Sequence, residues 1–318
     1  MSNITQDGRI EMECDSSYDN FMEIFKFLIQ LAYLIPGSIL HLSIVRAILW
    51  KFKSVYQTNS FFLIYTLDSG ASLIITLTDI FFNRLTVYIP PLCPILTPYF
   101  FEPSIFIKIM LITPNYFRAM KSITQIMMSI NRMTCVIFPF SYITIWKKYL
   151  KLSIIITLLS PFLVIWNLFL SRVYISPAFG GFSYDYLKYV KWASLSKFHL
   201  VFISLAIIIT IISTVVTMTF LIMLPTRVKS AEKSLCFSNI TISVAFLIVG
   251  GFQSFFAFFP EMYTDTIYSL QFLSYDFLNI SSPIVLVLMN LQLREHIFKK
   301  NGEGGGNSAF QVSKITVG

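Results

Sequence analysis

Residues Ile105–Arg132 read IFIKIMLITPNYFRAMKSITQIMMSINR, and this stretch constrains how the rest of the chain is arranged. Coiled as an α-helix, it places its polar side chains within about 100° of arc along its whole length. At about 1.5 Å per residue it is also long enough to cross a bilayer. A charged side chain at the bilayer centre costs about 2.5–3.5 kcal/mol even on insertion scales, so this polar stripe cannot face lipid. We therefore expect the helix to lie inside a bundle of other spans. The stripe consists of Asn115, Arg118, Ser122, Gln125, Ser129 and Arg132.

The composition indicates a membrane protein built from helices. Of the 318 residues, 55% are hydrophobic and only 13% are charged, whereas a soluble domain carries about 25% charged residues. The apolar runs are continuous and not alternating, which favours helices over a β-barrel. The predicted fold class is therefore an all-α membrane protein. The net charge of +8 lies beside apolar spans, so we interpret it as attraction to lipid headgroups, with no nucleic-acid partner.

The sequence contains no pattern typical of a metal site or an enzyme. Its four cysteines form no CxxC motif, and its three histidines are scattered. Cysteine and histidine ligands of a structural metal would recur at short spacings. The HExxH and GxSxG motifs are absent as well. We therefore expect no catalytic activity, no cofactor and no metal.

Seven apolar segments organise the chain as a seven-transmembrane helix bundle. An acidic segment precedes them and a basic stretch follows them. We predict an extracellular N-terminal segment at 1–24, the bundle at 25–291, an amphipathic helix at 292–300 and a disordered cytoplasmic tail at 301–318. The predicted spans are Phe25–Leu49, Phe61–Phe82, Ile105–Arg132, Leu152–Leu170, His199–Leu224, Leu235–Phe259 and Ile267–Leu291.

The short helix after the last span is expected from its amphipathic pattern. Leu293 and Ile297 lie four residues apart in the otherwise largely basic stretch QLREHIFKK. Such a helix lies in the plane of the inner leaflet. The alternative is a frayed end of the seventh span. The glycine-rich segment that follows is typical of a flexible tail.

Three signals favour an N-terminus outside and a C-terminus inside. The N-terminal segment is acidic, and Asn3 begins a sequon that is glycosylated only outside. More of the 24 Lys and Arg residues flank the predicted inner ends than the outer ends, where Arg84 is counted. Cationic loops are retained in the cytoplasm. The first span follows an acidic segment and is too long for a signal peptide, so we expect it to be retained.

Short motifs in the second, third and seventh spans, together with the span plan, point to one family. These motifs are Tyr65-Thr66-Leu67-Asp68 with Asp79, Gln125, Asn131-Arg132-Met133 with Pro139, and Asp276-Phe277-Leu278 with Ser282-Pro283 and Arg294. In this order the chain has the plan of G-protein-coupled receptors and resembles the nematode serpentine receptor class gamma chemoreceptors. The resemblance covers about residues 25–300.

The resemblance implies a chemosensory receptor in the plasma membrane of a sensory cilium. Such a receptor detects a small-molecule odorant or pheromone and couples to a heterotrimeric G protein. The sequence departs from the larger rhodopsin-like family in having Asn131 where that family has an acidic residue before Arg132. It also has no cysteine between residues 171 and 198. A transporter or ligand-gated channel is the alternative, but the chain shows no internal repeat.

Two cations within the third span have two interpretations. Arg118 and Lys121 either contact an anionic ligand that enters from outside or pair internally with Asp68, Asp79 or Asp276. Carboxylate or sulfate recognition would use the first arrangement, whereas internal pairing would neutralise the bundle without a ligand. The depth of Asp276 allows it to reach Arg118. The candidate ligand-binding residues are Asn115, Arg118, Lys121, Ser122, Asp79 and Asp276.

The inner end of the third span is the candidate switch. Arg132 lies at the mouth of the bundle, where it either faces a G protein or snorkels to lipid phosphate. Glu232, just before the sixth span, is a candidate partner of Arg132 in the inactive state. The candidate G-protein-side residues are Asn131, Arg132, Glu232, Lys147, Lys148, Arg227 and Lys229.

The predicted outer side holds two further features. Cys14 and Cys93 are the cysteines expected there, and they are either bridged in the oxidising lumen or left as free thiols. Cys135 and Cys236 face the reducing side and are expected to be free. The aromatic loop Ser171–Phe198 either folds over a pocket as a lid or forms an interfacial aromatic belt.

Overall fold

The computed structural model describes residues 2–4, 10–223, 226–259 and 265–298. Within these ranges, the side chains of 2–4, 221, 226–236 and 238–239 are outside the description. The tail predicted at 301–318 lies outside the described residues.

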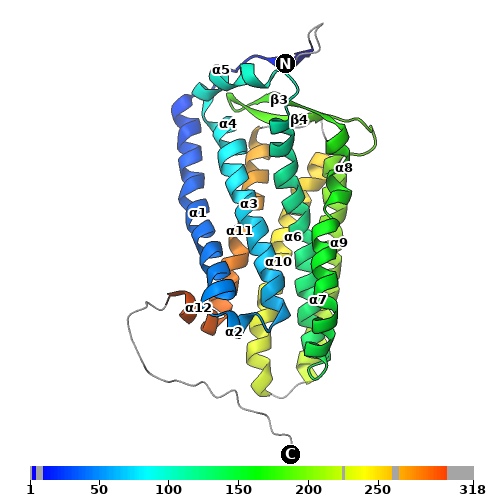
Figure 1. Cartoon of the computed structure of the whole chain (residues 1–318). Helices are drawn as coiled ribbons and strands as arrows, with labels where there is room; N and C mark the ends of the chain where they lie inside the picture. Colours follow the sequence, from blue (N-terminus) through cyan, green and yellow to red (C-terminus); the bar gives the residue numbers. More distant parts are fainter. Residues whose placement is uncertain (1, 5–9, 224–225, 260–264, 299–318) are drawn as a thin grey trace, which may run out of the picture.

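Long helices run side by side along one axis and form a single bundle (Figure 1). Among the described residues, six helices are long and apolar enough to cross a membrane. α6 supplies the seventh span when it is taken with the preceding segment Pro90–Phe100, from which it is bent by 119°. The long helices are α1 (Asn20–Arg46), α3 (Ser60–Thr78), α6 (Ile105–Ile137), α7 (Tyr142–Leu159), α8 (Phe162–Leu170), α9 (Leu195–Met223), α10 (Thr226–Phe258) and α11 (Asp265–Met289).

Shorter elements join and cap these helices. Two antiparallel strand pairs lie at one end of the bundle, and α12 lies at the other (Figure 1). We call these the hairpin end and the α12 end. The short helical elements are η1 (Ala47–Lys51), α2 (Lys53–Tyr56), η2 (Asp79–Arg84), α4 (Leu85–Tyr88), η3 (Pro90–Leu92), α5 (Cys93–Leu96), η4 (Thr97–Phe100) and α12 (Leu291–Phe298). The strands are β1 (Ser2–Ile4), β2 (Ile10–Met12), β3 (Arg172–Ala178) and β4 (Gly181–Leu187).

α6 lies inside the bundle, as the polar stripe predicted. It packs against α3, α7, α8 and α9. Within the stripe, Ser122, Gln125 and Ser129 are buried, and Ser129 donates a hydrogen bond to Thr210 of α9. Met120, on the opposite side of the helix, is buried as well. The polar side of α6 is therefore buried, whereas Ile123, Met127 and Ile130 on its apolar side are half-buried.

Side-chain caps fix where three of the spans begin. Asp19 accepts a hydrogen bond from a backbone N–H in the first turn of α1, Asn59 does so for α3, and Ser104 does so for α6. Such caps satisfy N–H groups that have no partner within the helix.

The second span is longer than the sequence pattern predicts. The prediction ended it at Phe82, but the helix continues through the π-helical turn η2 and then α4 to Tyr88. Arg84, which was assigned to the outer side, is therefore inside the bundle and fully buried. That assignment was wrong because the apolar pattern of the sequence stops at Asn83-Arg84. The helix continues past this point, and Arg84 pairs with a buried carboxylate.

The helix after the last span is a separate element. Asn290 interrupts the chain between α11 and α12, and its side chain accepts a hydrogen bond from the Leu293 N–H at 2.9 Å. Leu293 is fully buried beneath the bundle. This cap distinguishes α12 from a frayed end of the seventh span. Lys299 and Lys300, the last residues of the predicted helix, lie outside the described residues.

A β-hairpin covers the hairpin end of the bundle. β3 and β4 pair antiparallel from Arg172↔Leu187 to Ala178↔Gly181. Phe179 and Gly180 form the turn with positive φ of 51° and 76°, as a two-residue type I′ turn requires. The tip lies against the second span, because a Cβ on Gly181 would come within 2.1 Å of the Thr86 carbonyl oxygen. The loop thus has the position of a lid, one of the two expected alternatives.

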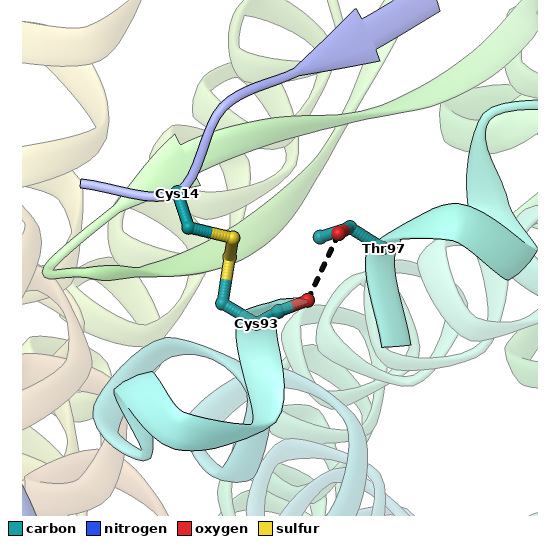
Figure 2. Close-up of a disulfide and its surroundings, with 3 residues drawn as sticks. All are labelled: Cys14, Cys93 and Thr97. Atoms are coloured by element: carbon teal, nitrogen blue, oxygen red, sulfur yellow. Dashed lines mark hydrogen bonds between the residues drawn. A yellow bond between two sulfur atoms is a disulfide. The ribbon is translucent and has the colours of Figure 1, made fainter. Parts of the chain in front are cut away.

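A disulfide fastens the N-terminal segment to α5 at the hairpin end. Cys14 and Cys93 are bonded, with their Cα atoms 6.1 Å apart (Figure 2). Met12 beside them is buried against Phe182 of β4. Tyr18 donates a hydrogen bond to Asp265 at the start of α11, and this carboxylate raises the pKa of Tyr18 to about 12. The N-terminal segment is therefore anchored both to α5 and to the start of α11.

Candidate functional site

Three buried aspartates lie in the described part of the bundle, and each has a cationic partner on another span. The carboxylate oxygens lie 2.5–3.3 Å from the partner nitrogens. Each pair joins two different spans and is removed from water, so each charge depends on its partner for compensation. The three pairs are Asp68–Lys121, Asp79–Arg118 and Asp276–Arg84.

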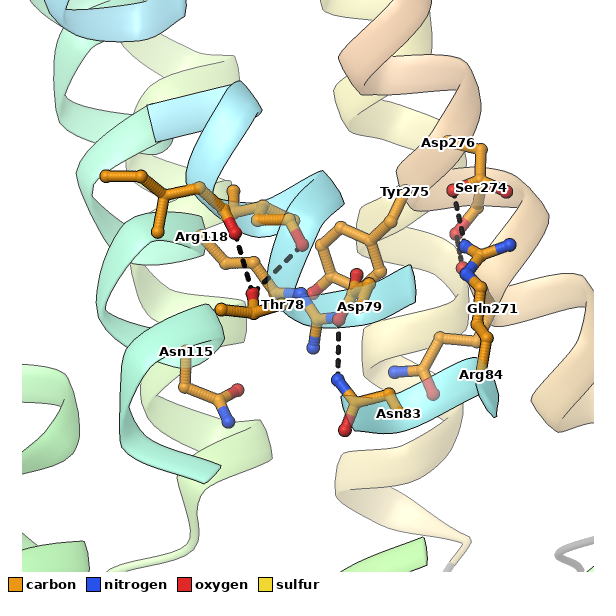
Figure 3. A network of polar contacts seen from close by, with 12 residues as sticks. Thr78, Asp79, Asn83, Arg84, Asn115, Arg118, Gln271, Ser274, Tyr275 and Asp276 are labelled. Carbon is orange, nitrogen blue, oxygen red and sulfur yellow. Dashed lines mark hydrogen bonds and ion pairs between the residues drawn. The ribbon is translucent and has the colours of Figure 1, made fainter. Parts of the chain in front are cut away.

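The Asp79–Arg118 pair joins α6 to the second span. One terminal nitrogen of Arg118 donates to both carboxylate oxygens of Asp79, at 3.0 and 2.9 Å. Asn83 donates to the same carboxylate at 2.6 Å. The Arg118 guanidinium also lies over the ring of Tyr275 in α11, 4.4 Å from its centroid. Figure 3 shows this group between the two helices, with Asn115 on the α6 side.

The second pair corrects the expected partner of Asp276. Arg84, and not Arg118, donates to Asp276 at 2.5 Å. Arg84 also donates to Gln30 of α1 at 2.6 Å, and Tyr33 of α1 donates to Asp276 at 2.6 Å. Three spans therefore meet at one buried guanidinium. The sequence pattern missed Arg84 because it placed this residue beyond the end of its span.

The third pair lies deeper, toward the α12 end. Lys121 donates to Asp68 at 3.3 Å and to Ser72 at 2.5 Å. Thr124 donates to the other Asp68 oxygen at 3.0 Å, and Ser282 of α11 lies 3.4 Å from Asp68. All these residues are buried. For both Arg118 and Lys121, the structure therefore contains the internal pairing that was one of the two expected alternatives.

A cavity of about 490 Å³ opens at the hairpin end between α6, α9, α10, α11 and β4. This volume is within the range of small-molecule sites. A second cavity of about 150 Å³ lies under the hairpin and shares Asn115, Arg118 and Tyr268 with the first. Residues that line the larger cavity include Leu111, Asn115, Arg118, Tyr184, Lys188, Lys191, Lys197, His199, Gln253, Phe256, Gln271 and Tyr275.

The wall of the larger cavity is predominantly cationic. Arg118 and three lysines line it, against the single carboxylate of Asp185. Two buried nitrogens on its lining residues have no hydrogen-bond partner among the described residues, namely Nε of Arg118 and Nε2 of His199. His199 is only 3% exposed. Sequence reasoning did not select His199, because a lone histidine at the start of an apolar run carries no motif.

The candidate ligand residues divide into two groups in the structure. Asn115 and Arg118 line both cavities, and Asp79 holds Arg118 from behind. Lys121 and Ser122 are buried nearer the α12 end, where Lys121 is bound to Asp68. Asp276 belongs with Arg84, as described above. The structure therefore brings Asn115, Arg118 and Asp79 together at the cavity floor and keeps the other three apart from it.

At the α12 end, Asn131 links three helices. It donates to Ser60 of α3 at 2.7 Å and accepts from Tyr142 of α7 at 3.0 Å. Arg132 is buried with its guanidinium over the Phe61 ring, 4.5 Å from the centroid. The base of α6 is thus tied to the second span and to α7 by a mixed polar and aromatic contact.

The remaining candidates lie at the periphery. Lys147 and Lys148 are exposed in the first turns of α7. The side chains of Glu232, Arg227 and Lys229 lie outside the described residues, and so does the proposed Arg132–Glu232 contact. The side chain of the sequon residue Asn3 lies outside them as well.

A capped bundle of membrane-spanning helices, with buried ion pairs beneath a cavity at one end, has the architecture of a seven-helix membrane receptor. Comparison with known proteins identifies the kind. The chain belongs to the Srg family chemoreceptors, whose family model matches residues 27–297. It is therefore a multi-pass membrane chemoreceptor, and the transporter or channel alternative is not favoured.

Curated relatives agree along nearly the whole chain. Serpentine receptor class gamma-16 of Caenorhabditis elegans is 47% identical over 285 residues, which cover 89% of this chain and 88% of that protein. Serpentine receptor class gamma-11 of the same organism is 44% identical over 316 residues, covering 99% and 93%. Serpentine receptor class gamma-5 is 43% identical over 298 residues, covering 93% and 91%. The resemblance to the serpentine receptor class gamma proteins is confirmed.

Proposed function

We propose that this chemoreceptor binds a small anionic molecule in the cavity at its hairpin end and signals to a heterotrimeric G protein at its α12 end. The hairpin end would face the outside at the plasma membrane of a sensory cilium. The receptor would work by a change of conformation, without catalysis. Binding would shift the bundle between two packings, and the α12 end would report the shift.

The charge of the cavity wall carries the proposal of an anionic ligand. Four cationic side chains face one carboxylate there, and Nε of Arg118 has no partner among the described residues. A buried donor without a partner carries a penalty of about 1–3 kcal/mol, which a ligand oxygen would remove. Arginine binds carboxylates through two parallel hydrogen bonds. An acidic group on the ligand would therefore bind at the floor, beside Asn115.

Two observations support the proposed orientation. The Cys14–Cys93 disulfide lies at the hairpin end, and disulfides persist in oxidising compartments outside the cytoplasm. Lys147 and Lys148 are exposed at the opposite end, which is where the positive-inside rule expects cations. A basic surface at that end would also suit a G protein or anionic lipid.

The test is a reporter-cell screen with matched pairs of compounds. Small carboxylic acids are applied beside their methyl esters, which keep the shape and remove the charge. We expect responses to acids and weak or absent responses to the esters. Arg118→Lys keeps a cation for Asp79 but loses the planar fork, so the potency of an active acid should fall about tenfold or more.

The control is Lys151→Gln, because Lys151 is an exposed cation on α7 that does not line the cavity. This variant should respond as the unchanged receptor does at equal surface expression. Esters that match their acids in potency would overturn the anionic ligand. A ligand-gated current that persists without G protein would overturn the coupling and favour a channel.

A further inference from the structure

A continuous chain of side chains crosses the cavity floor from the second span to α9. Asp79 holds Arg118, and Arg118 lies over the ring of Tyr275. The Tyr275 hydroxyl donates to the Gln253 Oε1 of α10 at 3.3 Å. The Gln253 Nε2 donates to the Ser196 carbonyl of α9 at 3.3 Å. Arg118, Tyr275 and Gln253 all line the cavity, so an occupant of the cavity contacts the chain directly.

Gln253 is the point at which this chain reaches α10. It is 5% exposed, and its Oε1 also accepts from Gln271 of α11 at 3.4 Å. Its amide therefore joins α10 to helices on both sides. By contrast, Thr241 and Ser254 of α10 donate to carbonyl oxygens of α10 itself. A buried amide with partners on two helices holds them in one relative position, because breaking these bonds leaves buried groups unsatisfied.

Immediately beside Gln253, α10 contains two residues of low helix propensity. Gly250 and Gly251 follow each other there, and glycine in a helix interior is about 0.8–1 kcal/mol less favourable than alanine. Ser254 donates to the Gly250 carbonyl oxygen at 2.8 Å, a bond to the preceding turn that often bends helices. Kinks in helices concentrate at glycine and serine pairs of this kind.

The two glycines have different surroundings. A Cβ on Gly250 would lie 3.2 Å from the Ile203 Cγ2 of α9, whereas a Cβ on Gly251 would meet nothing within 4 Å. Gly250 therefore permits close packing of α10 on α9. At Gly251 no packing reason requires a glycine, and its effect on the helix is backbone freedom. The Gly250–Gly251 pair separates the part of α10 that lines the cavity from the part that extends to the α12 end.

We propose that Gln253 is the positioning residue that transmits cavity occupancy to α10, and that α10 bends at Gly250–Gly251 when the Gln253 contacts change. The inference rests on the proposed ligand site in the same cavity. A ligand that binds Arg118 moves its guanidinium relative to the Tyr275 ring. Tyr275 then moves, and its hydrogen bond to Gln253 changes. The bend then moves the α12 end of α10 relative to α6, which the buried ion pairs hold to the second span.

The experiment measures this movement without ligand or G protein. Phe138 at the end of α6 and Phe237 of α10 are about half exposed, at 51% and 54%, and are replaced by cysteine for nitroxide labels. Cys135 and Cys236 are replaced by serine, and the purified full chain is studied in detergent by pulsed electron resonance. We expect one main distance in this parent and an added, longer population in Gln253→Leu.

Further variants separate the proposed role from a general loss of structure. Tyr275→Phe removes one hydroxyl and keeps the ring under Arg118, so it should give the longer population to a smaller extent. Combined with Gln253→Leu it should add nothing, because both changes break the same contact. Gly251→Ala should reduce the longer population. Gly70→Ala, also with nothing within 4 Å of its added Cβ, is the matched control in α3 and should not.

Two results would overturn the inference. One is a distance distribution of Gln253→Leu and Tyr275→Phe that superposes on that of the parent. The other is an equal effect of Gly251→Ala and Gly70→Ala, which would exclude the bend at the glycine pair. Both outcomes are independent of the ligand screen, so a failure of this inference can be told apart from a failure of the proposed function.

Discussion

Arg84 and Asp276 lie 192 positions apart in the sequence, yet a guanidinium nitrogen of Arg84 is 2.5 Å from a carboxylate oxygen of Asp276. Gln30 and Tyr33 of α1 bind the same two groups. This contact therefore fixes the first, second and seventh spans to one another at the hairpin end. Its position beside the Asp79–Arg118 pair makes it part of the support for the cavity floor (Figure 3).

Removing one partner of this pair should destabilise the receptor strongly. Arg84→Ala and Asp276→Ala each leave a buried charge uncompensated, which costs about 3–5 kcal/mol. We expect a large drop in thermal unfolding temperature in detergent and poor surface expression for each. The double variant should lose less than the sum. Lys151→Ala is the control, because Lys151 is an exposed cation on α7. A similar loss in the control would contradict the prediction.

Loss of the disulfide should loosen the cover at the hairpin end. Cys14→Ser is expected to lower the free energy of unfolding by about 2–4 kcal/mol, a typical effect of removing a cross-link. Cys93→Ser and the double variant should have the same effect as the single change, and reductant should reproduce it in the unchanged chain. Thermal unfolding measures all four. Cys135→Ser, at a half-buried cysteine of α6 outside this disulfide, is the comparison and should lose less. Additive losses in the double variant would argue against a shared bond.

The contact between the hairpin tip and the second span can be tested by adding one methyl group. Gly181→Ala would place a Cβ 2.1 Å from a backbone carbonyl oxygen of the second span, so the hairpin must lift away. We expect reduced surface expression and faster proteolysis within residues 171–198. Gly70→Ala serves as the comparison, since its Cβ meets open space and alanine favours a helix by about 0.5–1 kcal/mol. Unchanged protease resistance in Gly181→Ala would show that the tip is not held there.

The contact at the α12 end should restrain signalling. Tyr142→Phe removes a hydroxyl whose single proton lies between two acceptors, Oδ1 of Asn131 at 3.0 Å and Oδ1 of Asn59 at 3.3 Å. Each hydrogen bond is worth about 0.5–1.5 kcal/mol, so we expect basal nucleotide exchange on the G protein to rise by about two- to tenfold. Tyr149→Phe, on the same helix and 47% exposed, is the control. Equal basal exchange in both variants would exclude a restraining role for Tyr142.

Much of the architecture was predictable because the bilayer acts on short stretches of chain. A polar stripe on an apolar helix must be enclosed, which placed Ile105–Arg132 inside the bundle without any knowledge of its neighbours. The separate helix after the last span followed from the spacing of Leu293 and Ile297. The sequence of the hairpin also contains a strand pattern from which the hairpin was not predicted. Val173 and Ile175 alternate with more polar residues ahead of Gly180-Gly181, as a strand and turn require.

The pairing of the buried charges was harder to predict from the sequence. The acids and two of the cations were recognisable as buried, and internal pairing was one expected outcome for them. Arg84 was not recognisable, because a π-helical turn carries the helix past the point where the apolar pattern stops. Its pairing with Asp276 depends on how the second and seventh spans meet.

The sequence by itself determined that the chain spans the membrane with its third span enclosed, since the free energy of exposing charge to lipid is set within each helix. It also determined the family, through motifs spread along the chain. Only the tertiary structure decided which carboxylate holds which cation, where the cavity opens and that His199 and Gln253 line it. Those features depend on distances between residues on different helices, and such distances are fixed by packing, which no local pattern encodes.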